Sequence, residues 1–139
     1  MTEAPRRGVL DTSTLILLGR IEDQAALPEE PLITAVTLAE LSVGPLVATD
    51  ERERAARQAQ LQQAEADFEA LPFDAPAARA FGQVAASLRR HGRKPAARAY
   101  DAMIAATAIA NGLGVHTCNP DDFEGIEDLI VVACGASPG

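Results

Sequence analysis

Gly8-Val9-Leu10-Asp11-Thr12-Ser13-Thr14 is the stretch from which the fold of this chain can be worked out. Its two adjacent apolar residues, entered from a basic leader and closed by an acid and three hydroxyl residues, predict a buried strand that ends by presenting one carboxylate. Ligands of open α/β sheets bind beyond the carboxyl ends of the strands, so Asp11 would lie at the usual functional edge. Asp11 could equally be no more than the cap of the helix that follows. This stretch alone leaves both roles open.

Short apolar segments alternate with helical segments along the rest of the chain. Further strands are expected at residues 32–36, 115–118 and 129–133, with a short extended piece at 71–73. Helices are expected at residues 15–18, from 38 behind the cap Thr37 with a break or bend at Gly44-Pro45, at 48–70, at 75–90 behind the cap Asp74, and at 98–111. This alternation predicts an α/β domain with a central parallel sheet of four to five strands flanked by helices. We expect it to span residues 8–134, between a flexible leader (1–7) and a flexible tail (135–139).

The composition indicates one globular domain without a membrane-spanning segment. The chain has 139 residues, of which 47% are apolar, enough for a single core and too few to expect two domains. No apolar run approaches the roughly 18 residues that cross a bilayer, and the leader lacks the apolar core of a signal peptide. We therefore expect a cytoplasmic protein. Cys118 and Cys134 have neither metal-ligand nor redox spacing, so buried free thiols are expected, with a bridge between neighbouring C-terminal strands left open.

Positive charge is concentrated in one short segment of an otherwise acidic chain. The net charge of −8 argues against a nucleic-acid partner, since phosphate binding depends on Lys and Arg. Five of the 12 cationic side chains nevertheless fall within ten residues: Arg89, Arg90, Arg93, Lys94 and Arg98. Two interpretations of this cluster remain, a solvated helix end and loop or a contact surface for phosphate.

Acidic residues from four segments are expected at the same edge of the sheet. Asp11 and the loop 119–122 follow strands, while Glu40 and Asp101 lie near the starts of helices that should begin at that edge. Asp101 also lies on the apolar face of its helix, where a surface acid is not expected. Carboxylates about 4 Å apart repel by roughly 4 kcal/mol at an effective dielectric constant of about 20, so such a cluster needs a proton or a cation. Oxygen ligands without Cys or His favour a hard cation such as Mg²⁺ or Mn²⁺.

These acids fall in four short motifs that occur together in a known family. The motifs occupy residues 10–13, 37–41, 100–108 and 117–123, and read Leu-Asp-Thr-Ser, Thr-Leu-Ala-Glu-Leu, Tyr-Asp-Ala-Met-Ile-Ala-Ala-Thr-Ala and Thr-Cys-Asn-Pro-Asp-Asp-Phe. Their order and spacing resemble those of PIN-domain ribonucleases, and especially of the VapC toxins of bacterial VapBC toxin-antitoxin pairs. The resemblance extends from about Val9 to Val132, which is nearly the whole chain.

This resemblance implies a role for individual residues. The catalytic, metal-binding carboxylates would be Asp11, Glu40, Asp101 and Asp122, with the adjacent Asp121 as the alternative fourth acid. The polar positions that support the family's site through hydrogen bonds or water are matched by Ser13, Thr117 and Asn119.

For the whole chain, the resemblance implies a Mg²⁺- or Mn²⁺-dependent endoribonuclease in which a metal-activated water attacks an RNA phosphodiester. It further implies a homodimer that is inhibited by a cognate VapB-type antitoxin, whose tail covers the acidic cleft. An acidic cleft attracts a basic side chain from such an inhibitor, whereas RNA phosphate needs the metal and flanking cations to approach. We therefore assign the cluster at residues 89–98 to the RNA path.

Three other functions are compatible with parts of this pattern. A haloacid-dehalogenase-like phosphatase also has an Asp after its first strand, but that chemistry needs a second acid where Ser13 stands. A phospho-receiver domain needs a Lys at the end of a late strand, whereas the only lysine here, Lys94, lies in a loop before a helix. A PIN-like domain could also bind a partner without turnover, although the intact acids argue against this.

Overall fold

The computed structural model describes residues 6–135 of the chain. Most of the expected leader and tail therefore lies outside the described residues. The first strand, β1 (Arg7–Leu10), already begins at the last residue of the expected leader. This strand thus starts one residue before the expected domain boundary at residue 8.

The described residues form a five-stranded parallel sheet, which confirms the expected fold class. The strand order is β3-β2-β1-β4-β5, where the remaining strands are β2 (Glu30–Thr34), β3 (Ala70–Leu71), β4 (Val115–Thr117) and β5 (Val131–Ala133). Strand β1 is central, and its Val9 is in register with Leu32 of β2 and Val115 of β4. The strand that was expected to carry the functional acid is therefore the middle of the sheet.

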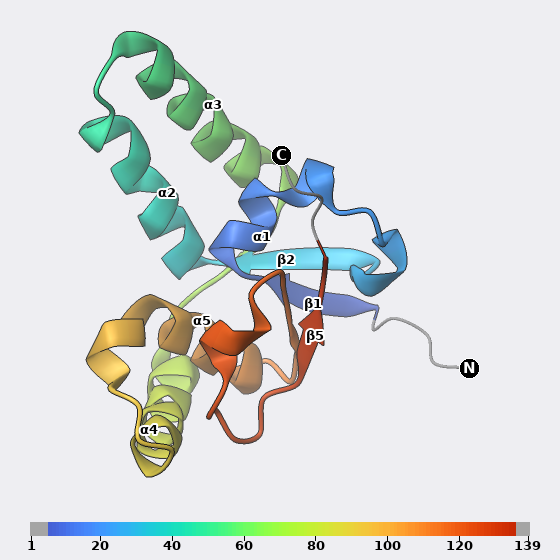
Figure 1. The fold of residues 1–139 in the computed structure, drawn as a ribbon, viewed down its shortest axis with the longest axis vertical. Coiled ribbons are helices and arrows are strands. Elements are labelled where there is room, and N and C mark those ends of the chain that lie inside the picture. The colour runs from blue at the N-terminus through green and yellow to red at the C-terminus, as the bar shows by residue number, and fades with distance from the viewer. Residues whose placement is uncertain (1–5, 136–139) are drawn as a thin grey trace.

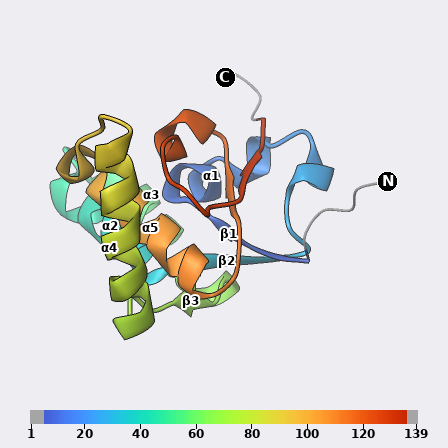
Figure 2. The same cartoon turned by 90° about the horizontal axis from the view of Figure 1, so that it is seen from below.

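Helices cover both faces of this sheet (Figure 1). They are α1 (Thr12–Ile16), α2 (Ala35–Val47), α3 (Glu51–Asp67), α4 (Ala75–Arg90) and α5 (Ala99–Ala110), with the short 3₁₀ helices η1 (Leu18–Arg20), η2 (Gln24–Ala26), η3 (Pro95–Arg98) and η4 (Pro120–Phe123). Helices α2 and α3 form an antiparallel hairpin that extends away from the sheet (Figure 1). Helix α4 packs along α5, as the turned view shows (Figure 2).

Alternation along the strands divides the core into two layers. Val9 and Leu32 pack with Ile104 of α5 on one face of the sheet. Leu10 and Ile33 pack on the other face, against apolar residues of α1, α2 and α3. The central strands β1 and β2 are thus buried on both sides from Val9 and Leu32 onward, as is usual for a parallel sheet.

The boundary between β2 and α2 differs from the expectation. The strand ends at Thr34 rather than at residue 36, and Thr34, not Thr37, caps the helix by accepting a hydrogen bond from the Thr37 backbone N–H at 3.3 Å. The helix also continues through Pro45 to Val47. The helix packs against α3, where Arg57 donates a hydrogen bond to the Gly44 carbonyl at 3.0 Å and so satisfies a carbonyl of the last helical turn.

Two further helices show where the predicted bounds were right and where they were wrong. Helix α4 has the expected bounds, and the Asp74 carboxylate accepts from the Ala77 backbone N–H at 3.1 Å. Helix α1, in contrast, begins at Thr12 rather than at residue 15, because Asp11 caps it. Its Ile16 is 49% exposed, so this helix is only partly buried.

His116 of β4 explains why a glycine occupies the second position of the first strand. The His116 ring lies so close to Gly8 that a β-carbon at this position would collide with it. Its Nδ1 bonds to the Ala26 carbonyl at 2.8 Å, while Nε2 has no hydrogen-bond partner among the described residues. This buried histidine thus has a hydrogen-bond partner for one of its two ring nitrogens.

The two cysteines are free thiols, as expected, with Cys134 buried and Cys118 only partly so. Within residues 6–135, no helix combines the length and hydropathy that crossing a bilayer would require.

Candidate active site

Asp11 is held in a fixed orientation at the carboxyl end of the central strand. Its side chain is almost fully buried, and Oδ1 accepts a hydrogen bond from the Thr14 backbone N–H at 3.2 Å, which caps α1. Oδ2 accepts from the Thr117 hydroxyl at 2.8 Å and from the Ser13 hydroxyl at 3.4 Å. The cap role that the sequence left open is thus real, and it leaves the second oxygen directed towards β4.

Hydrogen bonds join the end of β1 to the end of β4. Besides donating to Asp11, the Thr117 hydroxyl accepts from the Asn119 backbone N–H at 2.9 Å. The Asn119 side-chain amide in turn donates to the Ser13 hydroxyl at 3.1 Å. The three polar residues that the resemblance singled out therefore form one network around the Asp11 carboxylate.

Glu40 of α2 is linked through a hydrogen bond from Thr12 to the segment that follows Asp11. The Thr12 hydroxyl donates to Glu40 Oε1 at 2.7 Å and lies 2.9 Å from the Thr37 hydroxyl. Burial, with a smaller contribution from the Asp11 charge, raises the pKa of Glu40, whereas the Thr12 hydrogen bond opposes this shift. Sequence reasoning offered Thr12 only as one of three hydroxyls beside Asp11, and it did not identify this link to an acid 28 residues away.

The pKa of Asp101, in the first turn of α5, is shifted by burial and by the charges of the three other acids. Burial raises its pKa to about 6, and the charges of Asp122, Asp11 and Glu40 contribute in the same direction. Arg98 acts in the opposite direction. Carboxylates from four separate segments thus share one electrostatic environment at the edge of the sheet.

The two adjacent acids of η4 differ in their surroundings. Asp122 is partly buried, forms a salt bridge with Arg98 at 2.8 Å and acts on the pKa of Asp101. Asp121 is exposed. Of the two, Asp122 is the one that faces the acidic cluster.

The donor set fits a hard divalent cation in chemistry and charge. All four acids offer oxygen ligands, and Arg98 is the cation that acts on Asp101, so negative charge is in excess. No three His, Cys, Asp or Glu side chains within residues 6–135 are, however, grouped closely enough to hold a metal ion. Mutually repelling carboxylates separate when no cation draws them together. The acids therefore meet the electrostatic requirement of a metal site without forming a ready cage.

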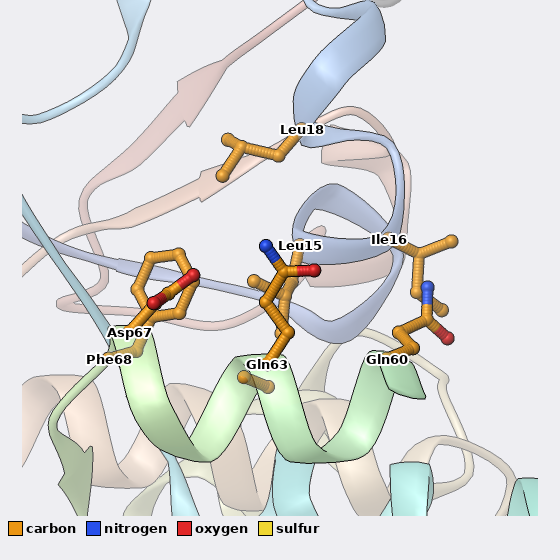
Figure 3. Close-up of a pocket in the computed structure, with 8 residues that line it drawn as sticks. Leu15, Ile16, Leu18, Gln60, Gln63, Asp67 and Phe68 are labelled. Carbon is orange, nitrogen blue, oxygen red and sulfur yellow. The ribbon is translucent and has the colours of Figure 1, made fainter. Parts of the chain in front are cut away.

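Three neighbouring cavities lie beside the acids and helix α3. Glu40 and Asp101 line a cavity of about 430 Å³ together with residues 96–100. Glu40 also lines a second cavity of about 310 Å³, which includes Ile16 and Gln60. Ile16 and Gln60 recur in a third cavity of about 230 Å³ between α1 and α3, which is lined by both apolar and polar side chains (Figure 3). The shared lining residues show that these cavities are neighbours.

The basic cluster at residues 89–98 is largely neutralised. Each of three arginines forms a 2.8 Å salt bridge with an acid of the 122–127 segment, in the pairs Arg90–Glu127, Arg93–Glu124 and Arg98–Asp122. The exposed Arg89 and Lys94 form no salt bridge within the described part of the chain. Arg98 is the member of this cluster that lies beside the acids.

Comparisons with known proteins identify the family of this chain. The PIN domain family model matches residues 8–129. Ribonuclease VapC5 of Mycobacterium tuberculosis is 42% identical over 129 residues, which cover 91% of this chain and 93% of that protein. The crystal structure of VapBC-5 from the same organism superposes with a TM-score of 0.82 at 39% identity, covering 93% of this chain and 99% of the matched one. DNA-bound VapBC from Salmonella typhimurium gives a TM-score of 0.72 at 28% identity, with coverages of 93% and 98%. Because these matches span nearly all of the sequence, the chain belongs to the PIN-domain family and, within it, to the VapC proteins.

Proposed function

We propose that this chain is a Mg²⁺- or Mn²⁺-dependent endoribonuclease toxin that hydrolyses RNA phosphodiester bonds. Family membership supports the reaction class, since PIN-domain ribonucleases generally depend on divalent metals. The observation that carries the proposal is the pKa of Asp101, raised to about 6 by burial and by three acids from other segments. Such mutual repulsion is the electrostatic signature of a site made to receive a cation.

In this proposal the ion is held by Asp11, Glu40, Asp101 and Asp122, directly or through water. When bound, Mg²⁺ or Mn²⁺ polarises a phosphoryl oxygen and lowers the pKa of a bound water. Thr117 and Ser13 fix the direction of the Asp11 carboxylate, and Thr12 does the same for Glu40. Glu40 and Asp101 also line the 430 Å³ cavity, so one of them is suited to orient the attacking water.

We further propose a VapB-type antitoxin as the partner that inhibits this activity. The similar solved structures include VapBC toxin-antitoxin complexes. The neighbouring cavities support the same partner. The one between α1 and α3 offers apolar side chains such as Leu15 and Phe68 to a hydrophobic segment (Figure 3), and the one lined by Glu40 and Asp101 suits a basic side chain. Copurification of a coexpressed antitoxin, with loss of RNA cleavage in the complex, would test this partner.

A homodimer acting in the cytoplasm completes the proposal. The exposed apolar side chains at the end of α2, Leu46 at 84% and Val47 at 60%, supply surface that a second chain could cover. The cytoplasm is the compartment that holds the RNA to be cleaved. Light scattering of the purified protein should give the mass of two chains.

The deciding experiment incubates purified protein with total RNA in Mg²⁺ or Mn²⁺, with and without chelator. Cleavage should require the metal and should be lost in Asp101→Asn. The control is Asp128→Asn, which removes an equal charge at an exposed position whose positive φ of 64° suits asparagine. Cleavage that persists in chelator or in Asp101→Asn would reject the mechanism. Absence of cleavage under every condition would favour the alternative, a PIN-like binding domain without turnover.

A further inference from the structure

Tyr100 is an exposed aromatic residue on the wall of the proposed catalytic cavity. It lies in the first turn of α5, next to Asp101, and lines the 430 Å³ cavity together with Glu40. The side chain is 56% exposed, and its hydroxyl forms no hydrogen bond within residues 6–135. Nothing within the described part of the chain therefore requires an aromatic ring at this position.

The surroundings of Tyr100 leave space beside the ring. The other residues from η3 and the start of α5 that line the cavity are Ala96, Ala97, Arg98 and Ala99, three of which have only a methyl side chain. The volume falls within the roughly 300–1,000 Å³ of small-ligand sites. The cavity thus combines two carboxylates with an exposed aromatic ring in its lining.

We propose that Tyr100 stacks against a nucleobase next to the scissile phosphate, so that this cavity is a nucleotide subsite. The inference rests on the proposed function, because the acids of the same cavity would hold the phosphate that is cleaved. A base attached to that phosphodiester lies only a few bonds from it, and Tyr100 lines the same cavity as Glu40 and Asp101. Stacking on an aromatic side chain is available to every base, so the subsite recognises single-stranded RNA without strict sequence preference.

The chain itself provides a probe for this contact. It contains one tyrosine and no tryptophan, so tyrosine fluorescence reports on Tyr100 alone. The protein is titrated in Ca²⁺ with a short single-stranded oligoribonucleotide and, separately, with an abasic oligomer of equal length, and emission is corrected for absorbance. We expect saturable quenching by the RNA and little by the abasic oligomer. Equal quenching by both, or none while labelled RNA is seen to bind by anisotropy, would overturn the subsite.

Kinetics of two variants provide a second, independent test. Tyr100→Phe keeps the ring and should keep the KM for a model RNA in Mg²⁺ or Mn²⁺, whereas Tyr100→Leu should raise KM about 10-fold with a smaller change in kcat. An unchanged KM in Tyr100→Leu rejects the subsite, and a loss of protein binding instead would assign the ring to a protein partner.

These results separate the subsite from the proposed function. Base-dependent quenching in a wild-type protein that cleaves no RNA would reject the nuclease and keep the subsite. Metal-dependent cleavage that is insensitive to Tyr100→Leu would keep the nuclease and reject the subsite.

Discussion

The acidic cluster and the arginine-rich turn at residues 89–98 are both dense in charge, but they are built in opposite ways. The acids come from four segments far apart in the sequence and act on one another at the edge of the sheet. The arginines are neighbours in the sequence, yet three of them pair with acids of the 122–127 segment. The two regions meet at Arg98, which pairs with Asp122 of the acidic cluster. Excess charge that the fold gathers from distant segments therefore indicates a site more strongly than a run of like charges in the sequence.

The energetic difference between the two regions follows from burial. Pairs such as Arg90–Glu127 are exposed, and each contributes only about 0.2–1 kcal/mol to stability. Asp11 is only 2% exposed, and burial is the main reason why the pKa of Asp101 is raised. The fold thus tolerates an electrostatic cost at the sheet edge that it avoids at the arginine-rich turn, as is typical of functional sites.

The largest expected effect is on catalysis at the buried end of the acidic cluster. Asp11→Asn keeps an oxygen for the Thr14 backbone N–H but removes the charge that the proposed ion needs. RNA cleavage should fall by more than about 100-fold, beyond what loss of a supporting partner typically costs. Cleavage rates and thermal unfolding are measured together, with Arg90→Gln from the turn as the control. If the two variants retain similar activity, the contrast between the regions has no functional meaning.

A smaller loss is expected when only the support of Asp11 is removed. Thr117→Val deletes the hydroxyl that donates to Asp11 and accepts from Asn119, and should lower cleavage by about 10- to 100-fold. Thr117→Ser retains the hydroxyl and should recover most of this activity. Equal activity of the Val and Ser variants would show that orientation of the carboxylate does not limit the reaction.

The same contrast explains which elements could be predicted from the sequence. The α4 bounds were correct because Asp74 and the apolar spacing mark a helix whose signals are all local. The start of α2 was wrong because Thr34 and Thr37 are both capable caps, and only packing selects Thr34. Helix α2 also continues through Pro45 to Val47, although Gly44-Pro45 is a local signal for a break.

For the site, Asp11 lies at a strand end and Asp101 in the first turn of a helix, positions that topology brings to one edge of the sheet. Glu40 lies in the second turn of α2, because this helix begins three residues earlier than expected. The catalytic roles of these acids stay predictions. The bond from Thr12 to Glu40 joins positions 28 residues apart and has no sequence pattern. The pairing of Arg93 with Glu124 likewise depends on how the 122–127 segment folds back over the turn. Side-chain partners across the fold are thus the part that the sequence leaves undetermined.

A moderate effect is expected on stability. A carboxyl with a raised pKa in the folded protein holds its proton more tightly there, so folding loses stability as the pH rises from 3.8 to about 6. Asp101→Asn removes this cost and should stabilise the metal-free protein at pH 7 by about 1–2 kcal/mol, after allowance for solvent screening. Denaturant unfolding in EDTA measures the difference in the free energy of unfolding between Asp101→Asn and wild type. This difference should disappear below pH 3.8, where the wild-type carboxyl is protonated in both states, and should shrink in Mg²⁺. A variant less stable than wild type at pH 7 would contradict mutual repulsion in the cluster.

The smallest effect is expected at the arginine-rich turn, where the RNA path was assigned from sequence. Lys94 is exposed and forms no salt bridge among the described residues, so Lys94→Ala should weaken RNA binding and reduce the salt dependence of log K by about one phosphate contact. Arg93→Ala should change this slope less, because Glu124 already neutralises the guanidinium. Binding is followed by anisotropy of labelled RNA over a range of salt concentrations. Equal and large losses for both variants would show that RNA displaces Glu124 and that the turn is an RNA surface after all, whereas no loss for either would remove the whole turn from the RNA path.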